Sequence, residues 1–584
     1  MTQIGRMVLK SSRTENIAPE DGIILGRALS MDCKRVAVAR DTASSSCMMA
    51  GAVISGLLFQ GVDVIDIGVV SAPAAAMFSG KADCTVYVVG RQGMVSGYYL
   101  LNPDGSLFRD EQIRHLDKFF QSPPERPSHE KLGRRMVRDG TTEAYNRAVM
   151  SVFSRETKCS IFLDCRYGTG SDSLPQILNR TGADVVAINA QRDPDFVGET
   201  DEMERLRSYV SQNPGSIGLL LNRTGTAVDV VDETGNAIPP ERMFALLVLY
   251  LKPSSIAMPV DSSSLLEDVF EKGVGIEIDT PFPEPPKHDV VLTRDNASAV
   301  CEAVSDGADL GYYHGSVIFR NGVLLGDGIR AATAIAQMAG TNSLHRITDL
   351  MPEYLREEKS VKCDLKADAF RHLFEENSGD MAGNWSQYGD SYRVVLDSGW
   401  FMLSLATRGD EGTWIEITAE SKDRAYLAGL MELAEDLVSR MLRGLRSVRH
   451  DLQLDGLAVR IVRLPAGPVV GLARYEMDSS RVPEEVLVLL RRLVGESGMG
   501  MGGPRQAVVY GGHPLVQEAV GIPVDRAREQ DHLGDHAVDL PCHAEELVRI
   551  GRPGRLVERV YEVDVHGVYP VAHRVFTSFS LTRE

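Results

Sequence analysis

The sequence has few cysteines and contains no C-x-x-C pair. Its 8 cysteines are scattered along 584 residues, a pattern typical of buried, reduced thiols and not of a disulfide framework. No apolar run approaches the roughly 20 residues needed to span a bilayer, and the first residues lack the apolar core of a signal peptide. These absences predict a cytoplasmic protein without disulfides and without membrane association.

Positive charge is also in short supply. The chain carries 62 basic and 81 acidic residues, which gives a net charge of -19. Such a balance repels the phosphate backbone of nucleic acids and anionic membrane surfaces. The most basic short run, "RMLRGLRSVR", is interpreted as the end of a helix, where cations are favourable. We therefore expect no nucleic acid partner.

The sequence does contain a repeated pattern of strand, polar loop, helix and strand. The first copy runs from "RVAVARDTASSS" to "QGVDVIDIG", the second from "IFLDCRYGTG" to "TGADVVAIN", and the third from "SIAMPVDSSS" to "KGVGIEIDT". Strands that alternate with helices indicate βαβ units and a mainly parallel sheet. Three copies predict three related α/β domains, with boundaries or long loops near residues 122–131, 251–255 and 351–360.

The pattern changes after residue 360. Strands are expected at "YRVVLD", "WFMLSLA" and "TWIEITAE", followed by an amphipathic helix from about Asp423 to Met441. This order predicts an α+β domain. A further unit begins at Leu457 with strands at "LAVRIVRL" and "VVGLARYEM" and a helix near residues 483–494, which predicts an additional C-terminal α+β domain.

Several short motifs in this order resemble the α-D-phosphohexomutase family. They are "ARDTASSS", "GVDVIDIGVVSAP", "DCRYGTG", "VVDETGNAI" and "GDGIRAA". The resemblance implies three α/β domains at residues 1–150, 151–252 and 253–352, and an α+β domain at 353–448. It also implies enzymes that shift phosphate between C1 and C6 of hexose phosphates. Such enzymes use a phosphoserine, an acidic Mg²⁺ loop, a sugar-binding loop and a phosphate clamp.

The first two of these loops depart from the family pattern. No hydroxyl stands at the phosphoserine position, where Arg91 and its neighbours lie, and Ser96 is the only serine nearby. The three aspartates of the metal loop are replaced by Asn222, Thr224 and Thr226. Neutral side chains are poor Mg²⁺ ligands. The sequence therefore predicts no metal and no other cofactor, and an "LLLNRTGTAVDVV" turn that satisfies its own polar groups.

The other two loops keep part of the family character. The sugar loop "GYYHGS" has Tyr312 and His314 where Glu and Ser are expected, and these side chains either contact a ligand or fill the cleft. The clamp "RGDEGT" keeps Arg408 and Thr413. Ala43 replaces the second arginine of the first motif. The candidate ligand-binding residues of these loops are Arg40, Ser44, Ser45, Arg91, Tyr312, His314, Arg408 and Thr413.

The tail, residues 453–584, resembles GyrI-like effector-binding domains. The resemblance rests on "VRIVRLPAGPVVGLARYEM", "VPEEVLVLLRRLVGESG" and "GPRQAVVYG". It implies a small-molecule groove with Tyr510, Tyr561 and Glu562 as candidate contacts, although aromatic residues in strands are more often core. The segment "DHLGDHAVDLPCH" leaves open a zinc site or an ordinary polar loop; its candidate ligands are His532, His536, Cys542 and His543.

Together these features predict a phosphohexomutase fold that has lost its mutase chemistry. The main interpretation is a protein that binds a sugar phosphate or another metabolite, or that acts as a regulatory or scaffold protein, with a protein partner or a second copy of itself as further options. The alternative is a divergent but active phosphohexomutase with a relocated nucleophile. Whether the protein is an enzyme stays open at this point, because both altered loops are essential to the family's chemistry.

Overall fold

The computed structural model describes most of the first 462 residues and the last strand of the chain. The described residues are 18–91, 94–121, 131–196, 201–285, 287–363, 365–379, 384–408, 412–447, 449–454, 457–462 and 580–583. The chain divides into two compact units. The first unit comprises residues 1–360, 384–411 and 416–431, and the second comprises residues 361–383, 412–415 and 432–584.

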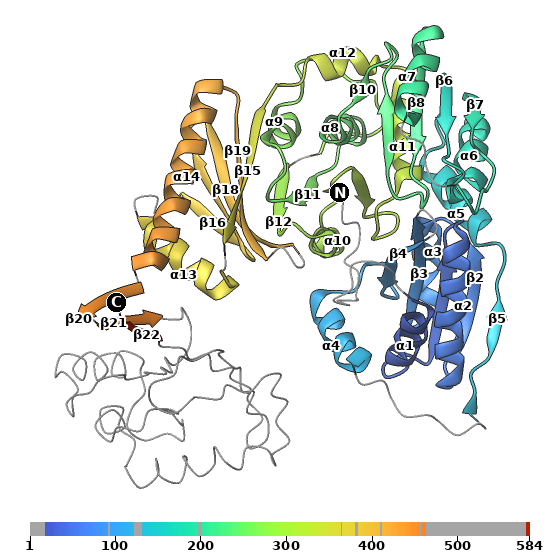
Figure 1. Ribbon diagram of the computed structural model, residues 1–584. Coiled ribbons are helices and arrows are strands. Elements are labelled where there is room, and N and C mark those ends of the chain that lie inside the picture. Colours follow the sequence, from blue (N-terminus) through green and yellow to red (C-terminus); the bar gives the residue numbers. More distant parts are fainter. Residues whose placement is uncertain are drawn as a thin grey trace. The chain divides into compact units, whose positions relative to one another are not determined.

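The first sheet of unit one is a five-stranded α/β sheet in the order β4-β3-β1-β2-β5. Its strands run parallel except β4, which returns beside β3. Helices α1 and α2 lie side by side on one face (Figure 1). The strands are β1 (Arg35–Arg40), β2 (Asp63–Val69), β3 (Cys84–Arg91), β4 (Met94–Leu101) and β5 (Arg135–Val137), and the helices are α1 (Pro19–Leu29), α2 (Ser44–Phe59), α3 (Ala72–Phe78), α4 (Asp110–Gln121) and α5 (Thr141–Val152).

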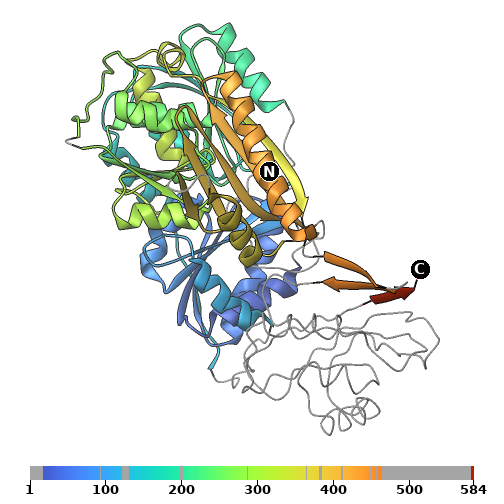
Figure 2. The same ribbon diagram turned by 90° about the vertical axis from the view of Figure 1, so that its left-hand side faces the viewer.

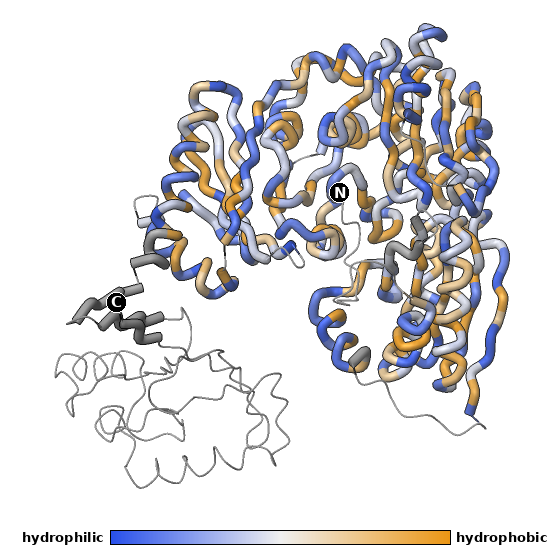
Figure 3. Tube along the Cα trace, viewed as in Figure 1, coloured by the Kyte–Doolittle hydropathy of each residue, from blue (hydrophilic) through white to orange (hydrophobic). Residues whose placement is uncertain are grey.

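The second sheet repeats this plan in the order β10-β9-β8-β6-β7. Strands β6, β7 and β8 are parallel, while β9 pairs antiparallel with β8. Along the covering helices, hydrophobic and hydrophilic segments alternate, as expected where one side of a helix is buried (Figure 3). The elements are β6 (Ser160–Asp164), β7 (Asp184–Ile188), β8 (Ser216–Leu221), β9 (Val228–Val231), β10 (Ala237–Ile238), α6 (Leu174–Arg180), α7 (Glu202–Gln212) and α8 (Pro240–Leu251).

The third sheet has four strands in the order β12-β11-β13-β14. The prediction that "KGVGIEIDT" forms its second strand is wrong, because the strand beside β11 is "DVVLT" at Asp289–Thr293. Those five residues present three apolar side chains to a parallel neighbour, whereas residues 273–281 form an irregular connection. The elements are β11 (Ser255–Pro259), β12 (Asp289–Thr293), β13 (Leu310–Tyr313), β14 (Ser316–Phe319), α9 (Ser264–Lys272), α10 (Ala297–Asp306), α11 (Gly328–Ala339) and α12 (Leu344–Asp349).

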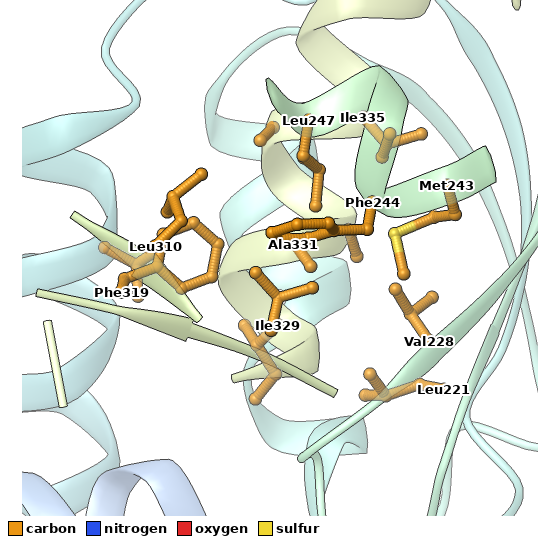
Figure 4. Close-up of a cluster of buried hydrophobic side chains, with 14 of the residues drawn as sticks. Leu221, Val228, Met243, Phe244, Leu247, Leu310, Phe319, Ile329, Ala331 and Ile335 are labelled. Atoms are coloured by element: carbon orange, nitrogen blue, oxygen red, sulfur yellow. The ribbon is translucent and has the colours of Figure 1, made fainter. Parts of the chain in front are cut away.

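One hydrophobic cluster extends through the three sheets. Helix α11 follows the third sheet in sequence but packs against α8 and against β8 of the second sheet. Figure 4 shows the junction, where Phe244 of α8 lies among Leu310, Phe319 and Ala331. Burial of a large apolar side chain stabilises the fold by about 1.5–3 kcal/mol. The shared core therefore fastens the second and third sheets to each other.

The fourth sheet is five-stranded, in the order β15-β19-β18-β17-β16. The segment 351–360, predicted as a boundary or a long loop, contains the first part of edge strand β15 (Leu355–Cys363). Its charged, mostly exposed residues are a common protection of a sheet edge. The predicted strands and long helix are confirmed, and the elements are β15 (Leu355–Cys363), β16 (Trp385–Tyr388), β17 (Ser391–Leu396), β18 (Gly399–Thr407), β19 (Thr413–Ser421), α13 (Ala367–Asn377) and α14 (Arg424–Ser447).

The described part of the tail is a small antiparallel sheet. Strands β20 (Arg449–Leu454), β21 (Leu457–Val462) and β22 (Ser580–Arg583) pair in this order, with the last residues of the chain beside β21 (Figure 2). The strand predicted at "LAVRIVRL" is confirmed for Leu457–Val462. Tyr510, Tyr561, Glu562 and the His532, His536, Cys542 and His543 cluster lie outside the described residues, as does nearly all of the predicted GyrI-like domain.

The fold confirms the expected α/β architecture with several sheets. Within the described ranges, the cysteines are free thiols. No helix in this part of the chain has the length and apolar character that a membrane crossing requires.

Candidate functional site

The first three sheets share one topological feature. In each, the first strand pairs in parallel with the second strand on one side and with the third strand on the other: β1 with β2 and β3, β6 with β7 and β8, and β11 with β12 and β13. The second and third strands of each sheet thus lie on opposite sides of the first strand, so the strand order reverses there. In open α/β sheets, the crevice at the carboxyl ends of the strands at such a switch point is the usual ligand site. The fold therefore contains three candidate crevices.

The first switch point lies between β1 and β3. Asp41 is fully buried there, and its carboxylate accepts hydrogen bonds from the backbone nitrogens of Ala43, at 3.0 Å, and Gly90, at 2.8 Å. Burial raises the pKa of Asp41, although these hydrogen bonds oppose the shift. Asp41 thus fastens the loop after β1 to the end of β3. Arg40 is half-buried beside it, and its guanidinium makes no hydrogen bond or ion pair with any described residue.

The predicted nucleophile loop is a β-hairpin. Strands β3 and β4 pair up to Arg91 and Met94, and a register shift occurs where Val89 faces Gly97 and Gly90 faces Val95. Ser96 is therefore the additional residue of a β-bulge, a feature that is over-represented next to active sites. The side chains of Arg91 and Ser96 lie outside the described set. The backbone nevertheless places Ser96 within the hairpin that extends from the first switch point.

The two predicted serines of the first motif begin helix α2. Ser44 donates a 2.8 Å hydrogen bond from Oγ to Asp195, and its backbone nitrogen donates to the carbonyl of Pro194. Ser45 is buried. Ser44 therefore connects the first sheet to the loop that follows β7 of the second sheet.

The second switch point holds the predicted metal loop, between β8 and β9. Asn222 donates from Nδ2 to Thr226 Oγ1, at 2.8 Å, and accepts the backbone N–H of Thr226 at its Oδ1, also at 2.8 Å. The hydroxyls of Thr224 and Thr226 lie 3.0 Å apart, and both threonines are buried. The prediction that the turn satisfies its own polar groups is confirmed. These neutral, mutually bonded side chains do not fit Mg²⁺, which prefers anionic oxygens. No role of a metal ion is assigned to this loop.

Tyr99 closes the other side of this loop. Burial raises the pKa of Tyr99 to about 12, against the opposing effect of hydrogen bonds that its oxygen accepts from the Thr224 and Thr226 hydroxyls. Its ring is stacked with that of Tyr87, at a centroid distance of 5.8 Å. The loop is therefore held against strands β3 and β4 of the first sheet.

Arg223 is a charged residue of the same loop that was not among the candidate ligand-binding residues predicted from the sequence. Its guanidinium donates to the carbonyl of Phe196, at 2.7 Å, and to Thr42 Oγ1, at 2.8 Å. Other arginines of this region have carboxylate partners, such as Arg166 with Glu202. The hydrogen bonds of Arg223 within the described part of the chain go to neutral oxygens, while its charge also acts on nearby Asp41 and opposes the rise in the pKa of that carboxyl. Arg223 therefore brings a positive charge without a direct ion pair to the boundary between the first two switch points.

The third switch point contains the predicted sugar loop. His314 and Gly315 are the two central residues of the turn between β13 and β14, and both have positive φ, at 43° and 87°. A two-residue hairpin of this kind requires positive φ at both positions. The His314 imidazole is 3.0 Å from the Asp295 carboxylate, and this hydrogen bond raises the pKa of His314. Tyr312 is buried instead, with its ring 5.0 Å from Phe244, so the packing interpretation of Tyr312 fits the structure.

Asp261 and Asp295 complete the third switch point, and sequence reasoning missed both. Asp261 follows β11 and Asp295 follows β12, so the carboxyl ends of adjacent parallel strands place them together. Asp261, Asp295 and His314 each offer a ligand atom within 4.8 Å of the other two. The repeat could have revealed Asp261, because "VDSSS" in the third copy matches "RDTASSS" in the first.

The predicted phosphate clamp lies at one end of the fourth sheet. Arg408, at the end of β18, donates hydrogen bonds to Ser360 and Glu416, both at 2.9 Å, so its charge is partly compensated. Thr413 donates from Oγ1 to the carbonyl of Cys363, at 2.7 Å. Residues 409–411 between them lie outside the described set. Both side chains thus have structural partners within their own sheet.

A cavity of about 550 Å³ lies at the other end of this sheet. The turn between β17 and β18 forms one wall, and helix α9 of the third domain forms another. Arg393 lines it, with its guanidinium 4.3 Å from the ring centroid of Trp400 and its side chain only 5% exposed. The cavity is polar on several sides, and Asp268 connects these sides through Lys272, Lys422 and Tyr354.

Acid should weaken the contacts of Asp268. Burial opposes its ionisation, but hydrogen bonds from Lys272, Lys422 and Tyr354 hold the pKa of Asp268 well below its usual range. A lowered folded-state pKa stabilises the fold fully above the unfolded value, about pH 4, and the stabilisation is lost as pH falls through the folded value. We expect Asp268→Asn to lower the free energy of unfolding by about 1 kcal/mol at pH 7, since the lysines are exposed.

The measurement is denaturant unfolding of wild type and variant at pH 7, 5 and 3. The difference between them should be constant from pH 7 to 5 and should shrink at pH 3. Asp397→Asn is the matched control, because Asp397 lines the same cavity and forms no ion pair with a described residue. An Asp268→Asn difference that grows in acid would contradict the assignment.

Comparison with known proteins places this arrangement in context. Residues 5–124 match the family described as phosphoglucomutase/phosphomannomutase, alpha/beta/alpha domain I. A protein of Methanococcoides burtonii named probable phosphoglucosamine mutase is 26% identical over 456 residues, which cover 76% of this chain and 100% of that protein. A protein of the same name from Pyrococcus abyssi is 27% identical, covering 75% and 97%. The chain is similar to proteins of the phosphohexomutase family over most of its length.

Solved structures of phosphohexomutases share the fold. A phosphoglucomutase/phosphomannomutase family protein from Burkholderia thailandensis superimposes with a TM-score of 0.61 at 18% identity, over 74% of this chain and 95% of that chain. The phosphoglucomutase parafusin from Paramecium gives a TM-score of 0.54 at 12% identity, over 73% and 92%. At these identities the likeness concerns the fold alone. It extends through nearly the whole length of both mutases.

The comparisons correct the main functional interpretation of the sequence. The expectation of a catalytically degenerate binding or scaffold protein is contradicted, because the curated relatives carry the name of phosphoglucosamine mutase and favour the alternative, an active mutase. The loss of the carboxylates removes only the Mg²⁺ ion as a means of compensating phosphate charge. Arg40 and Arg223 offer positive charge in the same crevices. The similar proteins carry the names of enzymes, so the comparisons do not support the expectation of inactivity.

Proposed function

We propose that the protein is a divergent, active phosphohexomutase, an intramolecular phosphotransferase that acts on a hexose phosphate. The observation that carries the proposal is the similarity to phosphoglucosamine mutases over their full length of 456 residues. Glucosamine phosphate is the first substrate to test, with mannose and glucose phosphates next. The proposal retains the predicted small-molecule partner, a phosphorylated sugar.

The charges at the first two switch points support phosphate binding. Arg40 and Arg223 form no hydrogen bond or ion pair with a carboxylate among the described residues, and Arg223 contacts Thr42 of the adjacent loop. A guanidinium binds phosphate oxygens through directed, charge-assisted hydrogen bonds. Phosphoryl transfer depends mainly on positioning and on charge compensation at the transferred group. Two such cations could therefore take part of the role that the altered metal loop cannot fill.

The carrier of the phosphoryl group is proposed to be Ser96. In the first transfer, the P–O bond to the serine breaks while a P–O bond to a hexose hydroxyl forms, and the hydroxyl proton ends on the serine oxygen. A second transfer in the opposite sense, from the other position of the resulting bisphosphate, restores the phosphoserine. The net reaction is an isomerisation that requires no oxidant and no water. The position of Ser96 in the β-bulge of the β3–β4 hairpin supports this assignment.

The test combines turnover with protein chemistry. The full chain is assayed with glucosamine, mannose and glucose phosphates and a catalytic amount of the matching 1,6-bisphosphate, and intact mass before and after bisphosphate treatment reports phosphorylation. We expect turnover and one phosphate per chain that maps to Ser96. Ser55→Ala, an exposed serine of α2, serves as the control that keeps the phosphate. Absence of both turnover and phosphoserine with every sugar would refute the proposal.

For the tail we propose a GyrI-like domain that binds a small molecule, with Tyr510, Tyr561 and Glu562 as contacts. The support is the sequence resemblance, together with the β-strand at Leu457–Val462. Thermal stability of the full chain in the presence of aromatic metabolites, compared with a Glu562→Gln variant, is the corresponding measurement. A protein partner or self-association stays a prediction.

A further inference from the structure

We propose that Asp261, Asp295 and His314 form a binding site for a divalent transition-metal ion. The site lies at the third switch point and is separate from the neutral loop between β8 and β9. Each of the three residues offers a ligand atom within 4.8 Å of the others. The proposal concerns metal binding and does not depend on mutase activity.

The three ligands come from the carboxyl ends of three adjacent strands. Asp261 follows β11, Asp295 follows β12, and His314 occupies the turn after β13, in the sheet order β12-β11-β13. The left-handed backbone of His314 and the following Gly315 forms a tight two-residue turn. Ligands carried by strand ends and a tight turn are held more precisely than ligands on long loops. The positions are thus determined by the sheet.

The internal repeat provides a comparison for Asp261. Aspartates occupy the end of the first strand in all three copies, as Asp41, Asp164 and Asp261. Asp41 accepts backbone hydrogen bonds from Ala43 and Gly90. Asp164 accepts one from the backbone of Arg166, and both its oxygens accept from the Asn189 side-chain amide. In the first two copies the carboxylate therefore serves the local fold.

Asp261 differs from its two counterparts. Its Oδ1 is buried and has no hydrogen-bond partner, while the side chain as a whole is 13% exposed. A buried carboxylate oxygen without a partner is costly, and a cation at this position would satisfy it. Asp261, with this unmet oxygen, belongs to the same cluster as Asp295 and His314, which points to a ligand that all three share.

Arg356 is the cation already nearest to the cluster. Its Nη2 is 4.0 Å from Asp261 Oδ2, beyond hydrogen-bond distance, while Nη1 donates to the Asp261 backbone carbonyl at 2.7 Å. Its Nε donates to Glu358 at 2.8 Å, which compensates part of its charge. Arg356 therefore limits the net negative charge but leaves Asp261 Oδ1 available. An ion would replace the present bond between His314 and Asp295 with bonds to both side chains.

The ligand types indicate the class of metal. An imidazole with two carboxylates suits Mn²⁺, Fe²⁺ or Zn²⁺ better than Mg²⁺ or Ca²⁺, which favour all-oxygen ligand sets. The remaining coordination positions would be open to water or to oxygens of a bound molecule. The proposed ligand is therefore a transition-metal ion, and Mn²⁺ and Zn²⁺ are suitable probes.

The experiment is equilibrium binding of Mn²⁺ and of Zn²⁺ to the full chain after treatment with a chelator. We expect one ion per chain at this site, and a loss of affinity of at least about tenfold in His314→Gln and in Asp261→Asn. Asp261→Asn is nearly isosteric, so circular dichroism should show a folded protein in which the loss of binding is interpretable. Protection against thermal unfolding by Mn²⁺ should disappear in the same variants.

His345→Gln is the matched control. His345 also lies between two carboxylates, with Nδ1 3.4 Å from Asp232 and Nε2 3.2 Å from Asp349. The two carboxylates contact opposite nitrogens of the His345 ring, so the three side chains do not converge on one point. The His345→Gln variant should therefore bind metal as wild type does. No binding by wild type, or full binding by His314→Gln, would overturn the proposal. The metal site is tested by ion binding and the proposed function by turnover. Retained mutase turnover in the metal-free protein would therefore support the proposed function without deciding whether the metal site exists.

Discussion

Replacement of Asp327 by Ala should lower the free energy of unfolding by about 3–5 kcal/mol, the typical cost of removing one partner from a buried ion pair. Asp327 is fully buried at the start of α11 and forms an ion pair with Arg330, at 3.3 Å, whose side chain is only 6% exposed. It also accepts hydrogen bonds from the Tyr145 hydroxyl and from the backbone nitrogen of Arg330. The Ala variant would leave a buried guanidinium without its partner and helix α11 without its N-cap.

The measurement is urea unfolding, with hydrogen exchange of the α11 amides as a local report. Asp327→Asn should cost less, because the amide oxygen still accepts from Tyr145 and caps the helix. The matched control is Glu204→Ala, which breaks the exposed Glu204–Arg207 pair at the same three-residue spacing and should cost less than about 1 kcal/mol. Equal costs for Asp327→Ala and Glu204→Ala would contradict the role of burial.

Replacement of Arg223 by Ala should lower kcat/KM of the proposed mutase reaction by about 100-fold, the usual range for loss of one charged or preorganised donor at a phosphoryl or acyl transfer site. Arg223 contributes a guanidinium without a direct ion pair, and its bonds to Phe196 and Thr42 hold together the loops of the first two sheets. Both effects act in the same direction, through charge and through position.

Two further variants separate these contributions. Arg223→Lys keeps the charge but loses the fork of donors, so it should recover part of the rate if charge dominates. Arg320→Ala is the control, because Arg320 also donates to a backbone carbonyl, that of Gly307. Arg320 follows β14, which runs antiparallel to β13. It therefore lies near the amino-terminal end of β13, at the opposite edge of the sheet from the switch point. Wild-type kinetics in a folded Arg223→Ala protein would exclude Arg223 from the site.

The altered metal loop illustrates how a motif can mislead. Asn222, Thr224 and Thr226 were correctly predicted to satisfy their own turn, because their short polar side chains are typical of such loops. The further step from missing carboxylates to missing catalysis was wrong. A sequence alignment records which side chains a loop has lost, whereas charge compensation depends on every group that reaches the crevice, including Arg223 of the same loop and Arg40 of another sheet.

The strands offer a second lesson. The "KGVGIEIDT" segment has the alternating pattern of a strand but forms a connection, while "DVVLT" pairs with β11. Likewise, charged "LREEKSVKC" resembles a linker but forms an edge strand. Local pattern cannot distinguish these cases, because pairing depends on which strand edge is available after the other elements have packed.

The sequence by itself determined the repeated βαβ plan, the buried strands and the self-contained turn at Asn222, because apolar periodicity and turn chemistry are local properties of the chain. Only the tertiary structure decided which side chains meet. It joined Arg223 to Thr42 across two domains, buried Tyr312 against Phe244, and brought Asp261, Asp295 and His314 from three loops to one point. Such meetings depend on strand order and register, which bring together residues that lie far apart in the chain.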